Sequence, residues 1–228
     1  MAMPIAILLS GGGSNLQAFI DCIEQGKLDA EIKVVISNKA DANGLARAKE
    51  YGIPCEVVSH NDYPTREDFD ARLVEIIRGT GIDADTGCVV LAGFMRILTD
   101  VFVGAFSGRI INIHPALLPS FTGADGQGDA DTYGVKLAGC SVHFVTLEMD
   151  SGPIIIQGAV PAYPTDDRDA LAKRILAVEH RIFPQAVQWF AHDRLSLMGR
   201  KVYLEPIGLE LAPPTQGVLV NPPLEEGF

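Results

Sequence analysis

The sequence lacks the long apolar run that a membrane-spanning helix requires. Its first hydrophobic stretch, residues 4–9, is far shorter than the roughly 20 apolar residues of such a helix, and it ends at Gly11-Gly12-Gly13. The chain also does not open with a basic segment followed by an apolar one, as a signal peptide does. We therefore expect a cytoplasmic protein that has no membrane partner.

Positive charge is also scarce. The 228 residues include 18 Lys and Arg against 29 Asp and Glu, which gives a formal net charge of −11. Such a balance disfavours a broad basic surface for nucleic acid. An anionic small molecule would instead need local positive potential from helix N-termini and a few arginines. We expect small-molecule substrates and no nucleic acid.

Cysteine is sparse, and its spacing is uninformative as a motif. The four cysteines, Cys22, Cys55, Cys88 and Cys140, are widely separated and form no C-x-x-C pair. This pattern predicts reduced thiols rather than a disulfide framework or a structural zinc site. We expect no metal.

The hydrophobic pattern predicts an α/β fold. Short apolar segments alternate with amphipathic ones, which is typical of a mostly parallel twisted sheet with helices on both faces and a Rossmann-like N-terminal half. Strands are expected at residues 5–10, 32–37, 55–58, 88–92, 109–113, 140–146 and 154–160, and helices at 15–24, 42–51, 65–78, 99–106 and 166–191.

Three segments depart from this alternation. Residues 121–131 are rich in Gly and Asp and are interpreted as a long mobile loop. Pro184 lies inside the last helix, where it should introduce a kink. We expect one domain over residues 1–204, followed by a loosely attached Pro-rich tail over residues 205–228.

A glycine-rich segment, Gly11-Gly12-Gly13-Ser14-Asn15, links the first strand to the first helix. Glycines let a ligand approach the backbone closely, and the free N–H groups at the start of the helix suit a phosphate. The spacing differs from both G-x-G-x-x-G and the Walker pattern, so a dinucleotide or ATP is a poor fit. The alternative is a tight turn that binds nothing.

A second candidate site lies where a later strand ends. Asn112 and His114 are two residues apart on that strand, so both side chains leave the same face. Asn112 could donate to an oxyanion, while protonated His114 stabilises charge or moves a proton. Asp150, in an Asp-Ser-Gly-Pro turn, would raise the pKa of His114 if folding brings the two together. The alternatives are a polar pair satisfied by backbone and a simple Asx turn.

Other polar residues are weaker candidates when taken alone. His143 lies within an apolar strand and is interpreted as a satisfied core histidine. Glu179 and Arg66 are typical of solvated helix surfaces. Residues 91–98 could line a pocket for a flat aromatic ligand, although a buried crossover is the commoner reason for such a run.

Taken together, these segments resemble the phosphoribosylglycinamide formyltransferase family, a branch of the folate-dependent formyltransferases. The resemblance runs in unbroken order from about residue 4 to about residue 195 and rests on residues 10–16, 37–41, 91–98, 112–119, 141–145, 150–153 and 179–180. Asn-x-His with a later Asp is shared by the wider superfamily, whereas the glycine loop and Glu179-His180 point to the glycinamide ribonucleotide branch.

The resemblance implies a formyltransferase domain over residues 1–204. Such a domain transfers the formyl group of 10-formyltetrahydrofolate, a co-substrate, to the amine of glycinamide ribonucleotide in de novo purine biosynthesis. It implies that His114 is the general acid, Asn112 an oxyanion donor and Asp150 the group that raises the pKa of His114. It also implies a monomer or homodimer with no metal.

The resemblance further implies two sets of binding residues. The ribonucleotide would be held by Gly13, Ser14, Asn15 and Glu179. The folate would contact Arg66, Met95, Arg96, Ile97, Leu98, Asn112, Thr146, Leu147, Glu148, Met149 and Asp150. Residues 121–131 depart from the family because they are acidic and contain no histidine.

The chemistry of the residues agrees with this reaction. The substrate amine attacks the formyl carbon itself, so the protein need supply no nucleophile, and rate enhancement comes from juxtaposing two bound reactants and stabilising the oxyanion. Two alternatives remain open. One is a formyltetrahydrofolate hydrolase, which uses water as acceptor, and the other is a non-catalytic folate- or nucleotide-binding relative.

Overall fold

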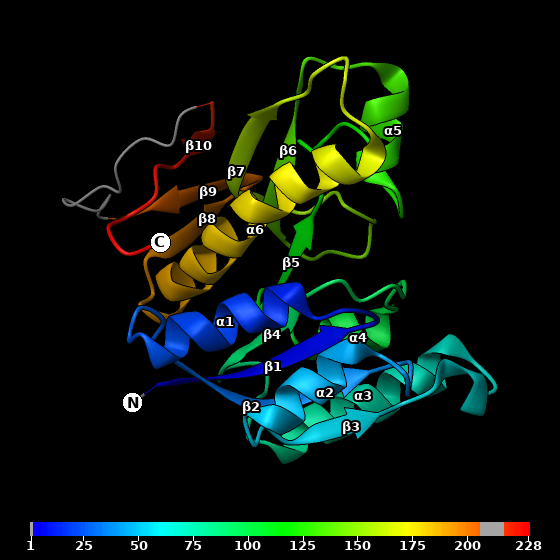
Figure 1. Ribbon diagram of the computed structural model, residues 1–228. Coiled ribbons are helices and arrows are strands. Elements are labelled where there is room, and N and C mark those ends of the chain that lie inside the picture. Colours follow the sequence, from blue (N-terminus) through cyan, green and yellow to red (C-terminus); the bar gives the residue numbers. More distant parts are fainter. Residues whose placement is uncertain (1, 206–216) are drawn as a thin grey trace. The chain divides into compact units, whose positions relative to one another are not determined.

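A computed structural model describes residues 2–205 and 217–228 of the chain (Figure 1). The chain divides into two compact units, Met1–Asn112 with Val145–Leu147 and Ile113–Phe144 with Glu148–Phe228. Residues 206–216 of the predicted tail lie outside the described residues. That residues 1–204 act as one domain stays a prediction.

The first unit is built on parallel strands. These are β1 (Met3–Leu9), β2 (Ala30–Ser37), β3 (Cys55–Val57), β4 (Cys88–Leu91) and the start of β5 (Ile110–His114), in the order β3-β2-β1-β4-β5. Ile7 at the centre pairs with Val35 on one side and Val90 on the other. The predicted α/β class with a mostly parallel sheet is confirmed.

Helices cover both faces of these strands: α1 (Ser14–Glu24) and α2 (Asn43–Glu50), and α3 (Arg66–Gly79) and α4 (Asp100–Ala105). Ala6 and Leu8 of β1 belong to one buried cluster with side chains of α3 and α4, among them Phe69, Leu73, Phe102 and Val103. Leu9 points the other way because side chains alternate along a strand, and it lies against Gly44 of α2.

Local sequence signals explain where α3 begins. Thr65 precedes the helix, and its Oγ1 accepts a hydrogen bond from the backbone N–H of Asp68 at 3.1 Å. Thr is a favoured residue at this capping position, and the acidic Asp68 three residues later is typical of a helix start. On the apolar side of α3, Leu73 and Ile77 are fully buried, while Ile76 is only partly buried against the core. A short 3-10 helix, η1 (His60–Asp62), precedes α3.

The second unit contains antiparallel strands. β6 (Leu137–Phe144) pairs with β7 (Ile154–Pro161), and the long helix α6 (Arg168–Ala191) packs against both. The inner face of α6 is apolar, and four of its residues at helical spacing are buried, namely Leu171, Ile175, Val178 and Ile182. The helix assignment continues through Pro184.

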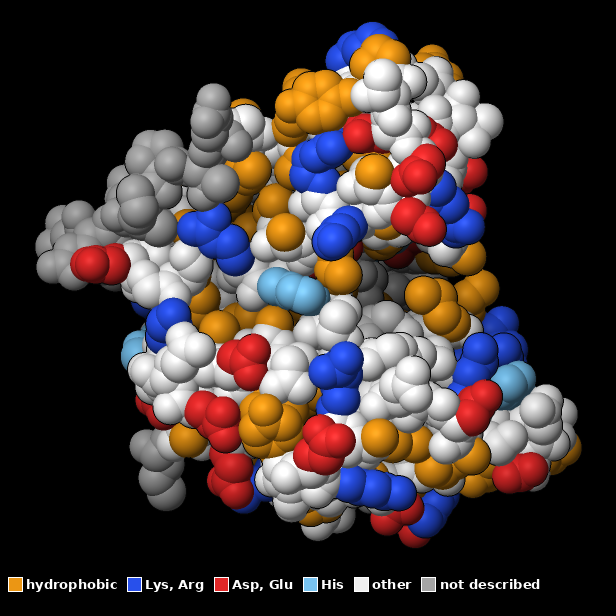
Figure 2. All heavy atoms as spheres, in the orientation of Figure 1, with side chains coloured by type: hydrophobic (Ala, Val, Ile, Leu, Met, Phe, Trp, Pro, Cys, Tyr) orange, Lys and Arg blue, Asp and Glu red, His pale blue; other side chains and the backbone are white. Residues whose placement is uncertain are grey.

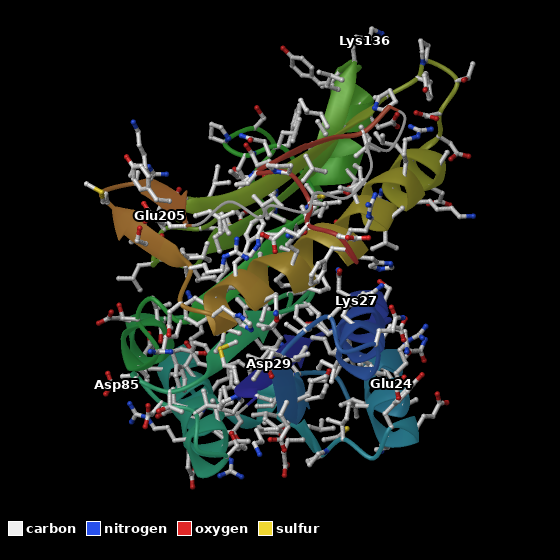
Figure 3. All side chains as sticks on the ribbon, turned by 90° about the vertical axis from the view of Figure 1, so that its left-hand side faces the viewer. Glu24, Lys27, Asp29, Asp85, Lys136 and Glu205 are labelled. Carbon is white, nitrogen blue, oxygen red and sulfur yellow. The ribbon has the colours of Figure 1, made fainter. Side chains whose placement is uncertain are left out.

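A hairpin that the sequence pattern did not predict follows α6. It consists of β8 (Leu195–Met198) and β9 (Lys201–Leu204), which form a separate two-stranded sheet. Figure 3 labels Glu205 at the end of this hairpin and Lys136 just before β6.

The prediction of a long mobile loop over residues 121–131 is wrong for its second half. Residues Gly126–Tyr133 form helix α5. Asp125 caps this helix by accepting a hydrogen bond from Gly128 N–H at 3.2 Å, and it also pairs with Arg168 of α6 at 2.6 Å. The aspartate that suggested a solvated loop therefore stabilises a helix start.

The prediction of a loosely attached tail is wrong for residues 217–228. Strand β10 (Leu219–Asn221) pairs antiparallel with β7. Glu225 makes a bidentate ion pair with Arg194, with N–O distances of 2.7 and 3.0 Å, and Leu224 is buried. The strand pairing of β10, the burial of Leu224 and the ion pair of Glu225 thus fix this segment to its unit.

The described residues include no helix that combines the length and apolarity needed to cross a membrane. On the face that Figure 2 shows, Lys and Arg side chains are interspersed with Asp and Glu. On this face the basic side chains therefore form no continuous positive surface, as expected for a chain with fewer basic than acidic residues.

Candidate active site

Strand β5 positions two of the predicted site residues. Asn112 pairs with Leu91 of β4 and is half-buried, whereas His114 at the strand end is buried with 4% of its surface exposed. Pro115 follows directly and has no N–H to extend the strand ladder. The strand therefore ends with an imidazole fixed in a largely water-free environment.

The second unit brings Asp150 to His114. The Oδ2 atom of Asp150 lies 3.6 Å from Nδ1 of His114, which is ion-pair distance. Asp150 has a φ of 51°, a left-handed conformation that Asp and Asn adopt more readily than most residues. Gly152 is required two residues later, because a Cβ there would collide with the carbonyl oxygen of Phe144. The Asp-Ser-Gly-Pro turn is thus shaped to place this carboxylate.

Backbone groups complete the surroundings of the pair. The N–H of Gly123 donates to Asp150 Oδ2 at 2.8 Å, and Nε2 of His114 lies 2.7 Å from the carbonyl oxygen of Phe121. Each ring nitrogen of His114 thus faces an oxygen acceptor.

His143 lies beside this pair. It is buried on β6, its Nδ1 is 2.8 Å from the Phe144 carbonyl oxygen, and its Nε2 is 4.0 Å from Asp150 Oδ1. Burial lowers the pKa of His143; the Phe144 carbonyl and Asp150 oppose the shift, and His114 adds to it. His143 is a satisfied core histidine, as predicted, but its closeness to Asp150 was not foreseen.

Ser141 and Gln157 support the chain that follows His114, and sequence reasoning gave them no role. The Ser141 hydroxyl donates to Ala116 O at 2.7 Å and accepts from Leu118 N–H at 3.0 Å. The side-chain amide of Gln157 donates to Ser141 Oγ at 2.8 Å and to Leu118 O at 3.0 Å. This network fixes the turn after β5, and it depends on the register in which Ser141 of β6 faces Gln157 of β7.

The glycine loop has the geometry expected of a backbone cradle. Gly13 precedes α1 with a φ of 71°, and no side chain caps the helix start. Ser14 is partly buried and Asn15 is buried, while Gly11 and Gly12 are exposed. The N–H groups that begin an α-helix lack intrahelical partners, so this end of α1 suits an anion.

The segment expected to contact folate is held by α3. The Arg66 guanidinium donates to Ile97 O at 3.0 Å, so this arginine is not simply a solvated charge. Met95 and Ile97 have 61% and 57% of their surface exposed, whereas Leu98 packs into the core of its unit. Apolar contacts to a ligand could therefore come from Met95 and Ile97 but not from the Leu98 side chain.

Two buried polar side chains hold the backbone at the two ends of residues 95–99, and sequence reasoning missed both. Ser10 Oγ accepts from Met95 N–H at 2.8 Å and donates to Asn38 Oδ1 at 2.6 Å. Asp70 Oδ2 accepts from Thr99 N–H at 2.5 Å. Burial raises the pKa of Asp70, and the bonds from Thr99 oppose the shift.

The remaining predicted residues fall on either side of the division between the units. Thr146 and Leu147 are exposed in the first unit, and Glu148 and Met149 are exposed in the second.

Glu179 lies on α6 and is 4% exposed, so the prediction that it is a solvated helix charge is wrong. Its carboxylate contributes, after burial, to the raised pKa of Cys140.

The four cysteines are free thiols, two of them buried. Within the part of the chain that the structure describes, no group of three His, Cys, Asp or Glu side chains is arranged to hold a metal ion.

Comparison with known proteins identifies the family. Residues 3–187 match the family described as Formyl transferase. The chain is 42% identical over 203 residues to phosphoribosylglycinamide formyltransferase of Escherichia coli (strain K12), covering 89% of this chain and 94% of that protein. It is 44% identical over 193 residues to the trifunctional purine biosynthetic protein adenosine-3 of Homo sapiens, covering 85% of this chain and 19% of that protein.

Solved structures agree with these relatives. The crystal structure of glycinamide ribonucleotide transformylase 1 from Symbiobacterium toebii superposes with a TM-score of 0.85 at 46% identity, covering 89% of this chain and 93% of that one. Because the family match spans most of the sequence and the Escherichia coli relative aligns over 94% of its length, this chain belongs to the formyl transferase family.

Proposed function

We propose that this protein transfers the formyl group of 10-formyltetrahydrofolate to the amine of glycinamide ribonucleotide, a step of de novo purine biosynthesis. The observation that carries the proposal is the buried His114 imidazole, with Asp150 Oδ2 at 3.6 Å from one nitrogen and an acceptor oxygen at 2.7 Å from the other. Relatives of similar length bear the name phosphoribosylglycinamide formyltransferase, which supports the same assignment.

In the proposed reaction the amine of the ribonucleotide attacks the formyl carbon directly. A C–N bond forms, the carbonyl oxygen becomes an oxyanion, and the bond from carbon to N10 of the folate then breaks. The amine loses one proton and N10 gains one, so the proton balance is closed. His114 acts as the general acid, and because an opposite charge nearby favours a charged form, Asp150 favours its imidazolium.

Oxyanion stabilisation supplies the catalytic advantage in this proposal. Asn112 and protonated His114 donate to the developing charge, and losing one such donor typically lowers the rate by about 10²–10³. Nε2 of His114 lies 2.7 Å from the neutral carbonyl oxygen of Phe121. An oxyanion is a stronger acceptor than that carbonyl, since hydrogen bonds to charged groups are roughly twice as strong.

The two substrates would use separate sets of residues. The ribonucleotide phosphate would bind the N–H groups of Gly13, Ser14 and Asn15, and Glu179 would contact the ribose hydroxyls or the glycinamide. The folate would lie against Arg66, Met95, Arg96, Ile97, Asn112, Asp150 and residues 146–149, with Leu98 contributing backbone only. The folate is a co-substrate, and no metal is part of this mechanism.

The test is a formylation assay in the presence and absence of glycinamide ribonucleotide. We expect turnover of 10-formyltetrahydrofolate only with the ribonucleotide, and a loss of about 10²–10³ in His114→Ala. His192→Ala, which removes an exposed histidine at the end of α6, is the matched control and should behave like the parent.

Other outcomes would favour the alternatives. Formate release without acceptor would identify a formyltetrahydrofolate hydrolase. An inactive parent, or equal turnover in the parent and His114→Ala, would indicate a non-catalytic folate- or nucleotide-binding protein. We further propose a cytoplasmic monomer or homodimer, which light scattering of the purified protein would distinguish.

A further inference from the structure

We propose that Arg47 is a positioning residue for the ribonucleotide phosphate. It fixes the Gly12 peptide so that the N–H groups of the glycine loop face the ligand, and its guanidinium adds positive potential there. This inference rests on the proposed function, which assigns the phosphate to this loop, but nothing in the sequence pattern pointed to Arg47.

Two hydrogen bonds attach the glycine loop to α2. The backbone N–H of Gly44 donates to Gly11 O at 3.0 Å, and Nε of Arg47 donates to Gly12 O at 3.0 Å. In a trans peptide the carbonyl and the following N–H point in opposite directions. Fixing the carbonyls of Gly11 and Gly12 on α2 therefore directs the N–H groups of Gly12 and Gly13 away from α2, where an anion can accept from them.

Close backbone contact lets Arg47 reach the loop. A Cβ on Gly13 would lie 2.5 Å from Gly44 Cα, and a Cβ on Gly44 would lie 2.5 Å from Leu9 Cδ2. Gly13, which also has a φ of 71°, therefore requires glycine, and a side chain at Gly44 would displace the buried Leu9 side chain. Arg47 follows Gly44 by three residues and so lies on the same face of α2. From there its side chain reaches the carbonyl oxygen of Gly12.

The charge of Arg47 is not neutralised by a carboxylate. Among the described residues its printed partners are both neutral: the Gly12 carbonyl, and Gln17 Oε1 at 3.3 Å from Nη1. Gln17 is itself oriented, because its amide nitrogen donates to Asp21 Oδ1 at 2.8 Å and to Tyr51 Oη at 3.0 Å. The first turn of α1 contains no acidic residue. In an acidic protein, a cation left unpaired beside a helix N-terminus is suited to an anion.

The alternative is that Arg47 only joins α1 to α2. A purely structural role predicts that its replacement lowers thermal stability and affects all kinetic constants together. A positioning role predicts a selective change in the KM for the ribonucleotide, because the folate and the reacting groups lie on other residues.

The experiment compares Arg47→Met and Arg47→Lys with the parent and with Lys49→Met. Lys49 is exposed on the same helix, so Lys49→Met removes one positive charge without touching the loop. For Arg47→Met we expect the KM for glycinamide ribonucleotide to rise about tenfold or more, since a charge-assisted hydrogen bond is lost. The kcat and the KM for folate should change less than about threefold. Arg47→Lys keeps the charge without the Nε bond and should lie between.

A second measurement does not depend on turnover. Calorimetric titration with ribose 5-phosphate should show binding to the parent and to Lys49→Met, and about tenfold weaker binding to Arg47→Met. Thermal unfolding confirms that each variant is folded. The proposal is overturned if Arg47→Met and Lys49→Met bind this probe equally well, or if kcat and both KM values of Arg47→Met change together with its melting temperature. A parent that binds the probe but does not formylate the ribonucleotide would instead refute the proposed function.

Discussion

At the scale of single residues, Asp150 combines a backbone requirement with a chemical one. Its left-handed φ of 51° closes the turn before β7, and its Oδ2 accepts from Gly123 N–H while facing His114. Because Asn shares the tolerance for this conformation but carries no charge, substitution can separate the two requirements.

We predict that Asp150→Asn folds like the parent but loses at least about 10²-fold in turnover, because the proposed general acid His114 would lose its counter-charge. Asp150→Ala should lose the same activity and also about 1–2 kcal/mol of unfolding free energy, because alanine lacks the short polar side chain that lets Asp and Asn adopt the left-handed conformation and that accepts from Gly123 N–H. Steady-state kinetics and urea unfolding measure the two effects. An active Asp150→Asn variant would contradict the assigned role.

His143 makes the stability of the fold depend on pH. Burial holds its pKa in the folded protein below the ordinary histidine value of about 6.5. As the pH falls below about 6.5, the unfolded chain therefore takes up the proton first, so the contribution to stability is present above that pH and is lost below it.

We predict that the parent loses unfolding free energy between pH 7.5 and 5.5 and that His143→Asn loses less over the same interval. The Asn amide can still donate to the Phe144 carbonyl in place of Nδ1. Urea unfolding at both pH values measures the difference. Identical losses in the two proteins would show that His143 does not titrate in this way.

The sequence predicted some of these residue-level features and not others. Asn112 and His114 could be assigned to one face because strand side chains alternate. Ser141 and Gln157 could not be found, because their hydrogen bond depends on the register in which Ser141 of β6 faces Gln157 of β7. That register is set by tertiary pairing, which one sequence does not reveal.

At the scale of elements, the contact of the glycine loop with α2 tolerates no side chain. We predict that Gly44→Ala lowers the unfolding free energy by about 1–3 kcal/mol through overpacking, because the new Cβ would lie 2.5 and 2.8 Å from the two Cδ atoms of Leu9. The KM for the ribonucleotide should rise as well, since the loop must shift.

Gly104→Ala provides the matched control for this prediction. Gly104 lies inside α4, where a Cβ would meet only Asp100 Oδ1 at an ordinary 3.6 Å. Alanine is the better helix former by about 1 kcal/mol, so this variant should be as stable as the parent or more so. Equal stability of Gly44→Ala and Gly104→Ala in urea would refute the packing argument.

Elements with a clear hydrophobic period were predicted to within a few residues. The helix expected at residues 99–106 is α4 (Asp100–Ala105), and the strand expected at 32–37 is β2 (Ala30–Ser37). Helix α5 was missed because its stability comes from the Asp125 cap and the partner Arg168 rather than from an apolar stripe. Strand β10 was missed because its three residues stand directly before Pro222 and Pro223, in a segment whose composition is typical of irregular chain.

At the scale of the whole molecule, the C-terminal residues complete the second unit. β10 pairs with β7, Leu224 is buried, and Glu225 binds Arg194. We predict that ending the chain at residue 216 lowers the unfolding free energy of the protein by about 2–4 kcal/mol. Burial of one leucine alone accounts for about 1.5–3 kcal/mol of this.

Two urea unfolding experiments check this prediction. Glu225→Gln keeps β10 and Leu224 but weakens the ion pair, so it should cost less than the truncation does. A truncated chain as stable as the parent would show that the segment only lies on the surface.

The short outer strands also bear on self-association. β3 and β10, the outermost strands of their units, have three residues each. Pro222 and Pro223 directly follow β10 and offer no N–H to a neighbour. A long exposed strand can act as a template on which a second molecule polymerises. Outer strands of three residues are too short to act as such a template, so the concentrated protein should resist fibril growth. Removal of β10 would expose the eight residues of β7 and should weaken this resistance.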